Sequence, residues 1–215
     1  MVLRIGKPFH PERYYSEANL ITCARLVGSL IFFILAIIHQ NHIYNYIGFI
    51  IHWLMDFIDG WYARNFKQET IFGAELDIIA DRFEIFFFFV IFLFFHPQLY
   101  LPAALYLIDY GFIDFYLSYQ FIKFDIISPN YFYKVDDTVY LLNYSPGGKF
   151  INSSAVILLL IFLPQISGLV VVLACALIVV KTYSIFRLAQ IEKVQCAQLN
   201  QAVDEGERLV WQTRK

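Results

Sequence analysis

The sequence predicts an all-α, polytopic membrane protein with six transmembrane helices. Of its 215 residues, 59% are hydrophobic and only 16% are charged, whereas soluble domains carry about 25% charged residues. The mean hydropathy is +0.57. The apolar residues gather in runs close to the roughly 20 residues that a helix needs to cross a bilayer. Lysine and arginine avoid every second connection between these runs, a pattern typical of loops that alternate between two sides of a membrane.

The six predicted spans follow one another with short connections. They cover residues 18–38, 43–65, 70–95, 99–124, 149–163 and 166–187. The fifth is short, and we expect it to borrow residues from the loop before it. Connections 39–42, 96–98 and 164–165 contain no lysine or arginine, so we expect both termini to face the cytoplasm. An even number of spans agrees with this orientation.

The remaining segments and the overall composition narrow the class further. Residues up to Asn19 mix aromatic and basic side chains and favour a short amphipathic segment on the membrane surface, although a polar tail is an open alternative. The loop over residues 125–148 mixes tyrosines with charges, which is typical of the membrane interface. We find no internal repeat, so residues 1–215 are interpreted as a single domain. A net charge of -2 argues against nucleic acid as a partner.

Four aspartates lie within or beside apolar helices. Asp56 and Asp59 are spaced i, i+3 on the second predicted helix, and Asp77 and Asp81 are spaced i, i+4 on the third, so each pair shares one helix face. A short turn joins the two helices and brings these faces together. Four neighbouring carboxylates require cations, and oxygen ligands suit Mg²⁺, Mn²⁺ or Ca²⁺. Two divalent ions at such a site are a known means of phosphoryl displacement.

Small and basic residues accompany the aspartates. Gly60 and Gly73 lie beside them, where a missing side chain lets a ligand approach the backbone. Ala63 is similarly small, and Arg64 can bind a phosphate through its forked guanidinium. This combination favours a phosphorylated ligand at the membrane–water boundary.

The pattern D-x2-D-G-x2-A-R-x8-G-x3-D-x3-D, from Asp56 to Asp81, resembles the signature of the CDP-alcohol phosphatidyltransferase family. The resemblance implies transfer of a phosphatidyl group from CDP-diacylglycerol to a small polar alcohol with release of CMP, in phospholipid biosynthesis. It also implies a homodimer, two Mg²⁺ or Mn²⁺ ions and an active site that faces the cytoplasm. We expect the setting to be a bacterial inner membrane.

The resemblance assigns roles to residues of this chain. Asp81 is the implied catalytic base, and the implied ligands of the metal pair are Asp56, Asp59, Asp77 and Asp81. The residues implied to hold the CDP group are Gly60, Ala63, Arg64 and Gly73, with a weaker match at Asn19 and Thr22.

The acceptor is the least determined part of the prediction. Lys149, Arg82 and Arg25 could form a cationic mouth for a phosphorylated acceptor, or they could simply reach toward the interface. The balance leans slightly to glycerol 3-phosphate or an inositol-type polyol, and serine is the alternative.

Buried carboxylates favour the opposite interpretation. Asp114, Asp109 and Glu84 lie within predicted spans, where they would prefer acceptor hydroxyls or an amine over a phosphate. The alternative is that they pair with Arg25, Arg82 or a tyrosine hydroxyl. Of these three, Asp114 is the candidate for acceptor binding.

Two other functions compete with this one. A membrane prenyltransferase also holds a diphosphate through aspartates and Mg²⁺, but such enzymes resemble longer chains with two separate aspartate motifs. A divalent cation transporter would distribute its carboxylates along the membrane depth, whereas here the four are gathered at one boundary.

Overall fold

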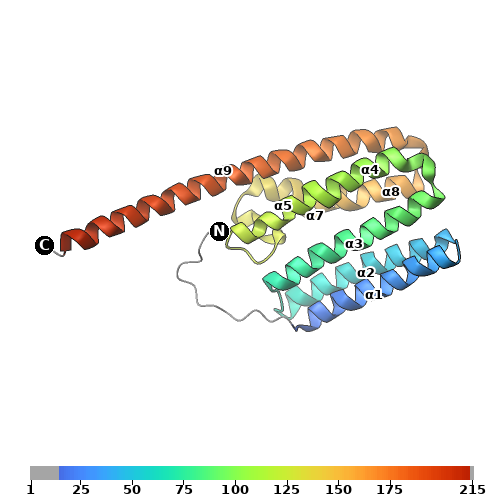
Figure 1. The fold of residues 1–215 in the computed structure, drawn as a ribbon, viewed down its shortest axis with the longest axis horizontal. Helices are drawn as coiled ribbons and strands as arrows, with labels where there is room; N and C mark the ends of the chain where they lie inside the picture. Colours follow the sequence, from blue (N-terminus) through green and yellow to red (C-terminus); the bar gives the residue numbers. More distant parts are fainter. Residues whose placement is uncertain (1–14, 214–215) are drawn as a thin grey trace.

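The computed structural model describes the backbone of residues 15–213 and the side chains of residues 15–198, 200 and 201. The elements of this part of the chain are all helices, with no strand, which confirms the all-α class (Figure 1). The predicted amphipathic N-terminal segment falls mostly on residues 1–14 and so lies outside the described residues.

The first three helices form one packed group, in which each contacts the other two. They are α1 (Glu17–Ile38), α2 (His42–Asn65) and α3 (Ile71–Phe95). Each begins at a polar residue whose side chain accepts a backbone N–H of the first turn: Ser16 for α1, Asn41 for α2 and Thr70 for α3. The chain reverses between α2 and α3 at Lys67, whose φ of 54° is left-handed. The sequence boundaries for these helices are close to the observed ones.

The second half of the chain is more broken. Its α-helices are α4 (Tyr100–Ile108), α5 (Phe115–Tyr119), α6 (Asp137–Val139), α7 (Pro146–Lys149), α8 (Val156–Phe162) and α9 (Ser167–Thr213). Three π-helical segments interrupt them: η2 (Asp109–Asp114), η5 (Tyr140–Tyr144) and η6 (Phe150–Ala155). The 3₁₀ turns are η1 (Pro97–Leu99), η3 (Gln120–Lys123), η4 (Pro129–Lys134) and η7 (Pro164–Ile166). The predicted start of the fifth span at residue 149 is late, because helix already begins at Asp137 and continues after a 43° bend. The bend falls at Ser145, whose extended backbone precedes Pro146.

Only part of the predicted membrane topology can be recognised in the helices themselves. Among the described residues, Glu17–Ile38 and Pro164–Gln198 are long and apolar enough to cross a membrane, and the bent pair Asp137–Tyr144 and Pro146–Phe162 would make a third span. The other three predicted spans, which carry the site's carboxylates, are not recognised in this way. The count of six spans and the orientation of the termini stay predictions.

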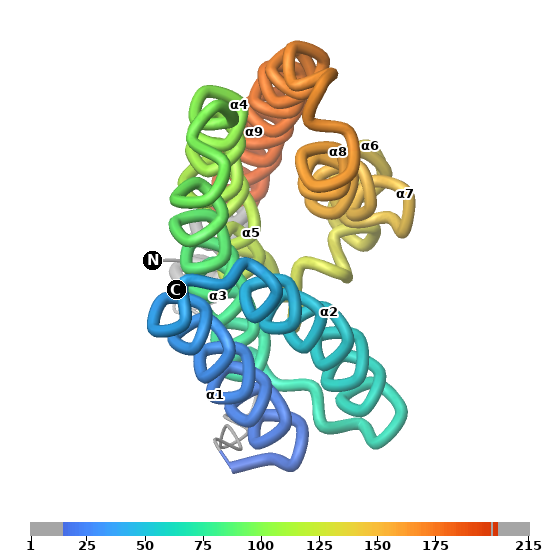
Figure 2. Tube along the Cα trace, turned by 90° about the vertical axis from the view of Figure 1, so that its right-hand side faces the viewer, coloured from blue at the N-terminus to red at the C-terminus, as the bar shows by residue number. Residues whose placement is uncertain are grey.

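Apolar packing joins the two halves. Phe33 of α1, Phe88 of α3, Tyr106 of α4 and Leu160 of α8 belong to one buried cluster. In the two views α4 and α8 both run beside α9, and in Figure 1 both lie between α9 and the α1–α3 group (Figures 1 and 2). Beyond this bundle α9 continues alone toward the C-terminus (Figure 1).

A buried ion pair links α9 to η2. The Nζ atom of Lys181 lies 2.5 Å from Oδ2 of Asp109 and 3.2 Å from Oδ1 of Asp114. The side chains of Lys181 and Asp109 are fully buried. A charge in such a place persists only with a partner, so this contact fixes how α9 packs on α4 and η2.

We expect Lys181→Met to destabilise the protein strongly, because it leaves the Asp109 carboxylate buried without its cation. Removing one partner of a buried ion pair costs about 3–5 kcal/mol. The matched control is Lys123→Met, which breaks a more exposed pair of 2.9 Å with Glu192 and should cost about 0–1 kcal/mol. Thermal unfolding in detergent measures both, and equal losses in the two variants would contradict the assignment.

Candidate active site

A cavity of about 240 Å³ opens among α1, α2, α3 and the π-helical segments. Thirteen of the fourteen residues predicted for the site line it. They are Asn19, Thr22, Asp56, Asp59, Gly60, Ala63, Arg64, Gly73, Asp77, Asp81, Arg82, Asp114 and Lys149. The predicted residues of α2 and α3 thus lie on surfaces that face one cavity, as the helical periods require.

Arg25 is the one predicted residue that does not line the cavity. Its fully buried guanidinium lies beneath the four aspartates. Its Nη1 atom is 2.6 Å from Oδ1 of Asp56, 3.2 Å from Oδ2 of Asp59 and 3.2 Å from Oδ1 of Asp77. Its Nη2 atom is 2.8 Å from Oδ1 of Asp81. Arg25 was expected at the acceptor mouth, but α1 directs it into the carboxylate cluster, where it acts as a counter-cation.

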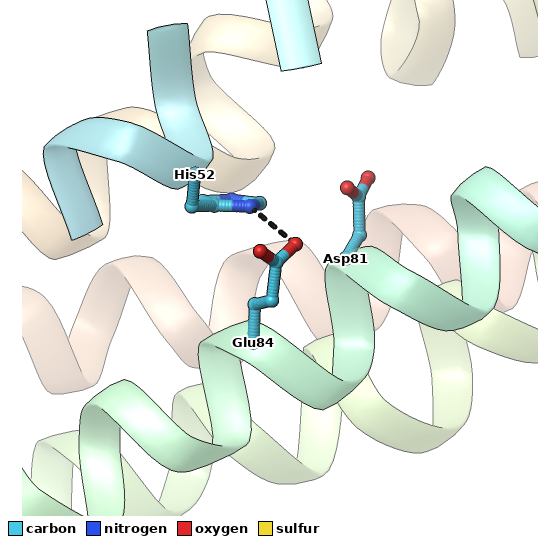
Figure 3. A group of neighbouring side chains, drawn as sticks. All are labelled: His52, Asp81 and Glu84. Atoms are coloured by element: carbon cyan, nitrogen blue, oxygen red, sulfur yellow. Dashed lines mark hydrogen bonds and ion pairs between the residues drawn. The ribbon is translucent and has the colours of Figure 1, made fainter. Parts of the chain in front are cut away.

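A fifth carboxylate, that of Glu84, contacts Arg25 at its Nε atom. Oε2 of Glu84 lies 3.2 Å from Nε of Arg25 and 2.9 Å from Nδ1 of His52, and Oε1 accepts a hydrogen bond from Ser29. Figure 3 shows His52 and Glu84 directed toward one another, with Asp81 one turn away on α3. Glu84 is fully buried. It is thus a pairing residue for Arg25, and His52 is its hydrogen-bonding partner.

The α1 side of the cavity is tightly packed around small residues. The Thr22 hydroxyl donates to Oδ2 of Asp59 over 2.9 Å. A Cβ atom added at Gly73 would lie 2.8 Å from Oδ1 of Asn19 and 3.0 Å from Oγ1 of Thr70. A Cβ atom at Gly60 would lie 3.2 Å from an Nη atom of the Arg64 side chain. Both glycines therefore leave space that a larger residue would remove.

On the other side of Asp81 the charges are paired. Arg82 donates to Asp114, lies 3.8 Å from Oδ2 of Asp81 and stacks over the Tyr110 ring at 4.4 Å. Asp114 also lies 3.2 Å from Nζ of Lys181. The two carboxylates, Asp109 and Asp114, thus meet two cations, Arg82 and Lys181.

The loop before α6 closes over the cavity rim. The Tyr131 hydroxyl donates to Oε2 of Glu69 over 2.6 Å, and this bond with the carboxylate is the main reason that the pKa of Tyr131 rises to about 12. Lys149 donates to Oδ1 of Asn130 and is exposed. Two side-chain bonds therefore tie this loop to the α2–α3 turn and to α7.

Several cavity residues had not been anticipated from the sequence. They are Tyr110, Ser118, Ser128, Asn130, Asn143, Tyr144, Asn152 and Ser153. Polar side chains within predicted spans were a usable signal for some of them. Their directions could not be inferred, because five of them, Tyr110, Asn143, Tyr144, Asn152 and Ser153, lie in π-helical segments, where the α-helical period does not hold.

The aspartate cluster suits divalent cations. One carboxylate oxygen each of Asp56, Asp59 and Asp77 lies within 4.8 Å of the others. Asp81 belongs to a second such group with His52 and Glu84. In the described chain, Arg25 is paired with one oxygen of each aspartate, so the second oxygen is free of that guanidinium. An all-oxygen donor set of this kind fits Mg²⁺ or Mn²⁺.

Comparison with known proteins assigns the chain to a family of membrane-integral transferases. The sequence model of the CDP-alcohol phosphatidyltransferase family matches residues 15–180. This chain therefore belongs to the CDP-alcohol phosphatidyltransferase family, a family of enzymes of phospholipid biosynthesis.

Two curated proteins resemble parts of the chain. The CDP-diacylglycerol–glycerol-3-phosphate 3-phosphatidyltransferase of Aquifex aeolicus is 32% identical over 92 residues, which are 42% of this chain and 50% of that protein. The CDP-diacylglycerol–inositol 3-phosphatidyltransferase of Schizosaccharomyces pombe is 39% identical over 72 residues, which are 34% of this chain and 30% of that protein. The matched stretches thus span half or less of these relatives. No solved structure matches.

We expect Arg25→Met to destabilise the metal-free protein, because five carboxylates would then face one another without their shared cation. Loss of one member of a buried charge cluster costs about 3–5 kcal/mol. Addition of Mn²⁺ should raise the melting temperature of this variant more than that of the wild type. The control is Arg187→Met, which removes a guanidinium paired with Asp136 at 2.8 Å outside the cavity. An Arg25→Met protein as stable in EDTA as the wild type would contradict the counter-cation role.

Proposed function

We propose that the protein transfers a phosphatidyl group from CDP-diacylglycerol to a small polar alcohol and releases CMP. The observation that carries this proposal is the gathering of four aspartates from α2 and α3 around one cavity, in a chain that belongs to this transferase family. The names of both curated relatives describe the same transfer with different alcohols.

The α1–α3 side of the cavity is proposed to hold the cytidine diphosphate. Gly60, Ala63 and Gly73 leave its surface open to the backbone, and Arg64 at the rim offers a guanidinium for a phosphate. Asn19 and Thr22 supply polar groups from α1. The diacylglycerol chains would stay in the lipid phase next to the exposed aromatic residues of α2, such as Phe57 and Trp61.

Asp81 is proposed to accept the proton of the acceptor hydroxyl. It lines the cavity, and its side chain is 20% exposed. Its Oδ1 atom is held by Arg25, which fixes the carboxylate and leaves Oδ2 toward Arg82. The acceptor oxygen would attack the phosphorus that carries diacylglycerol, in line with the departing CMP oxygen.

The residues proposed to hold two divalent ions are Asp56, Asp59, Asp77 and Asp81. When bound, such ions would neutralise charge at the diphosphate and stabilise the departing CMP. The chain's own contribution is to keep the four carboxylates in place, through Arg25 below them and Thr22 beside Asp59. Mg²⁺ and Mn²⁺ both fit this set.

The proposal also covers the acceptor, the membrane topology and the assembly of the protein. The acceptor is proposed to be glycerol 3-phosphate or an inositol-type polyol, with Lys149, Arg82 and Asp114 on the acceptor side of the cavity. We further propose six spans, cytoplasmic termini, an active site that faces the cytoplasm, a bacterial inner membrane and a homodimer. The four aspartates line one cavity, which favours this transfer over transport of a cation, because a transporter would distribute its carboxylates along the membrane depth.

Asp81→Asn should abolish CMP release from CDP-diacylglycerol while the melting temperature stays near that of the wild type, because an amide cannot accept the proton. The control is Asp137→Asn, which changes an exposed carboxylate outside the cavity and should leave turnover unchanged. Release of CMP with Mg²⁺ or Mn²⁺ measures the reaction. Pyrophosphate release from a prenyl diphosphate would instead support a membrane prenyltransferase. Divalent cation flux in liposomes without CMP release would instead support a cation transporter.

Gly73→Ala should weaken the donor, since the new methyl group meets Asn19 and Thr70 and pushes them into the nucleotide side of the cavity. We expect the KM for CDP-diacylglycerol to rise about tenfold, which corresponds to about 1.4 kcal/mol. Gly168→Ala is the matched control, because nothing lies within 4 Å of its new Cβ atom. The two variants should be compared by steady-state kinetics, and an unchanged KM in Gly73→Ala would remove Gly73 from the nucleotide site.

A further inference from the structure

One side of the cavity is formed by residues that the proposed donor site does not use. Its surface is formed by Ser118, Ser128, Asn143, Tyr144 and Asn152, which we call the polar wall. All of these side chains are uncharged. Every π-helical segment of the described chain, η2, η5 and η6, contributes residues to the cavity, and such segments are frequent at functional sites.

Three side chains of the polar wall are more than nine-tenths buried yet retain unsatisfied atoms. Oδ1 of Asn143 and Oγ of Ser128 have no hydrogen-bond partner among the described residues, and the Tyr144 hydroxyl lies beside Ser118 without a well-formed hydrogen bond. The three residues are 3%, 7% and 7% exposed. Buried polar atoms without partners are costly, and these three belong to residues that line one cavity, which favours a polar ligand there that could supply the missing bonds.

The orientation of Asn143 defines what it can bind. Its Nδ2 atom donates to the carbonyl oxygen of Val139 over 3.0 Å and to the hydroxyl of Ser184 over 2.8 Å. The Ser184 hydroxyl itself donates to the carbonyl of Val180, so it cannot donate to Asn143. The amide nitrogen is therefore used, and the carbonyl oxygen remains as an acceptor. Hydroxyl groups, which donate and accept, match this oxygen and the hydroxyls of Ser128 and Tyr144.

The charges near the polar wall are already compensated. Arg82 donates to Asp114, and Lys181 is paired with both Asp109 and Asp114. Among the described residues, the remaining cation on this side is Lys149 at the exposed rim, where it donates to Asn130. A phosphate monoester carries about -1.5 to -2 charges and is normally bound by arginine or lysine side chains that are available to pair with it. The wall is therefore suited to an uncharged ligand.

The polar wall lies next to the proposed base. Arg82 donates to Oγ of Ser118 over 3.3 Å and lies 3.8 Å from Asp81. We propose that the polar wall is the acceptor subsite, and that the acceptor is an uncharged polyol with several hydroxyl groups, of the inositol type. This inference rests on the proposed function and selects one acceptor class within it. One hydroxyl oxygen forms the new O–P bond, its proton passes to Asp81, and the bond from phosphorus to CMP breaks.

The test offers CDP-diacylglycerol with myo-inositol, glycerol 3-phosphate, inositol 1-phosphate or serine to the full-length protein, and it identifies the lipid product. Tyr144→Phe and Ser128→Ala each remove only a hydroxyl. Tyr144→Phe retains the ring, which stacks on Phe132 with centroids 5.0 Å apart. We expect myo-inositol to be the preferred acceptor, and we expect each variant to raise its KM about fivefold with an unchanged KM for CDP-diacylglycerol.

Matched controls separate this effect from general damage. Tyr46→Phe removes a hydroxyl that contacts His96, and Asn45→Ala changes a buried asparagine that donates to the Phe88 carbonyl; neither residue lines the cavity. Neither should change the KM for myo-inositol. A clear preference for glycerol 3-phosphate, inositol 1-phosphate or serine would overturn the inference and leave the proposed transfer standing. Absence of CMP release with every acceptor would overturn both.

Discussion

The compensation of charge at membrane depth is the constraint on which this structure depends. Five carboxylates, from Asp56, Asp59, Asp77, Asp81 and Glu84, surround the buried guanidinium of Arg25. Five carboxylates and one guanidinium sum to four formal negative charges, the amount that two divalent cations neutralise. Arg25 alone is thus enough to assemble the cluster but not to balance it. The remaining deficit gives the chain a physical reason to bind ions at this place.

The same constraint determines how the helices pack. Arg25 on α1 contacts carboxylates of both α2 and α3, so the charge cluster and the mutual packing of these three helices are one arrangement. In the other half, Lys181 of α9 holds Asp109 and Asp114 of η2. Arg82 connects the halves, since it contacts Asp81 on its own helix and Asp114 across from it. The cavity lies between two charge clusters, of which one is balanced and the other has a formal excess of negative charge.

The residues of α2 and α3 could be predicted because regular helices preserve spacing. Asp56 and Asp59 share one helix face, and so do Asp77 and Asp81, independently of the tertiary structure of the rest of the chain. The position of Arg25 could not be predicted, because an arginine in the first span can lie either at the rim of the cavity or within a buried carboxylate cluster. Only the packing of α1 against α2 and α3 determines which of the two it occupies. Asp109 was expected to pair with Arg25, Arg82 or a tyrosine, but its partner is Lys181, far along the chain.

The polar wall was beyond prediction for a different reason. In a π-helical segment the backbone bonds from i to i+5, so each such turn contains an additional residue and rotates the later residues of the helix about its axis. Asn143 and Tyr144 are adjacent in sequence, and both line the cavity just before the 43° bend. An α-helical period offers no means to anticipate this. The two sides of the cavity therefore differ in backbone structure. Regular helices hold the carboxylates at fixed spacing, whereas irregular turns contribute uncharged side chains to the same cavity.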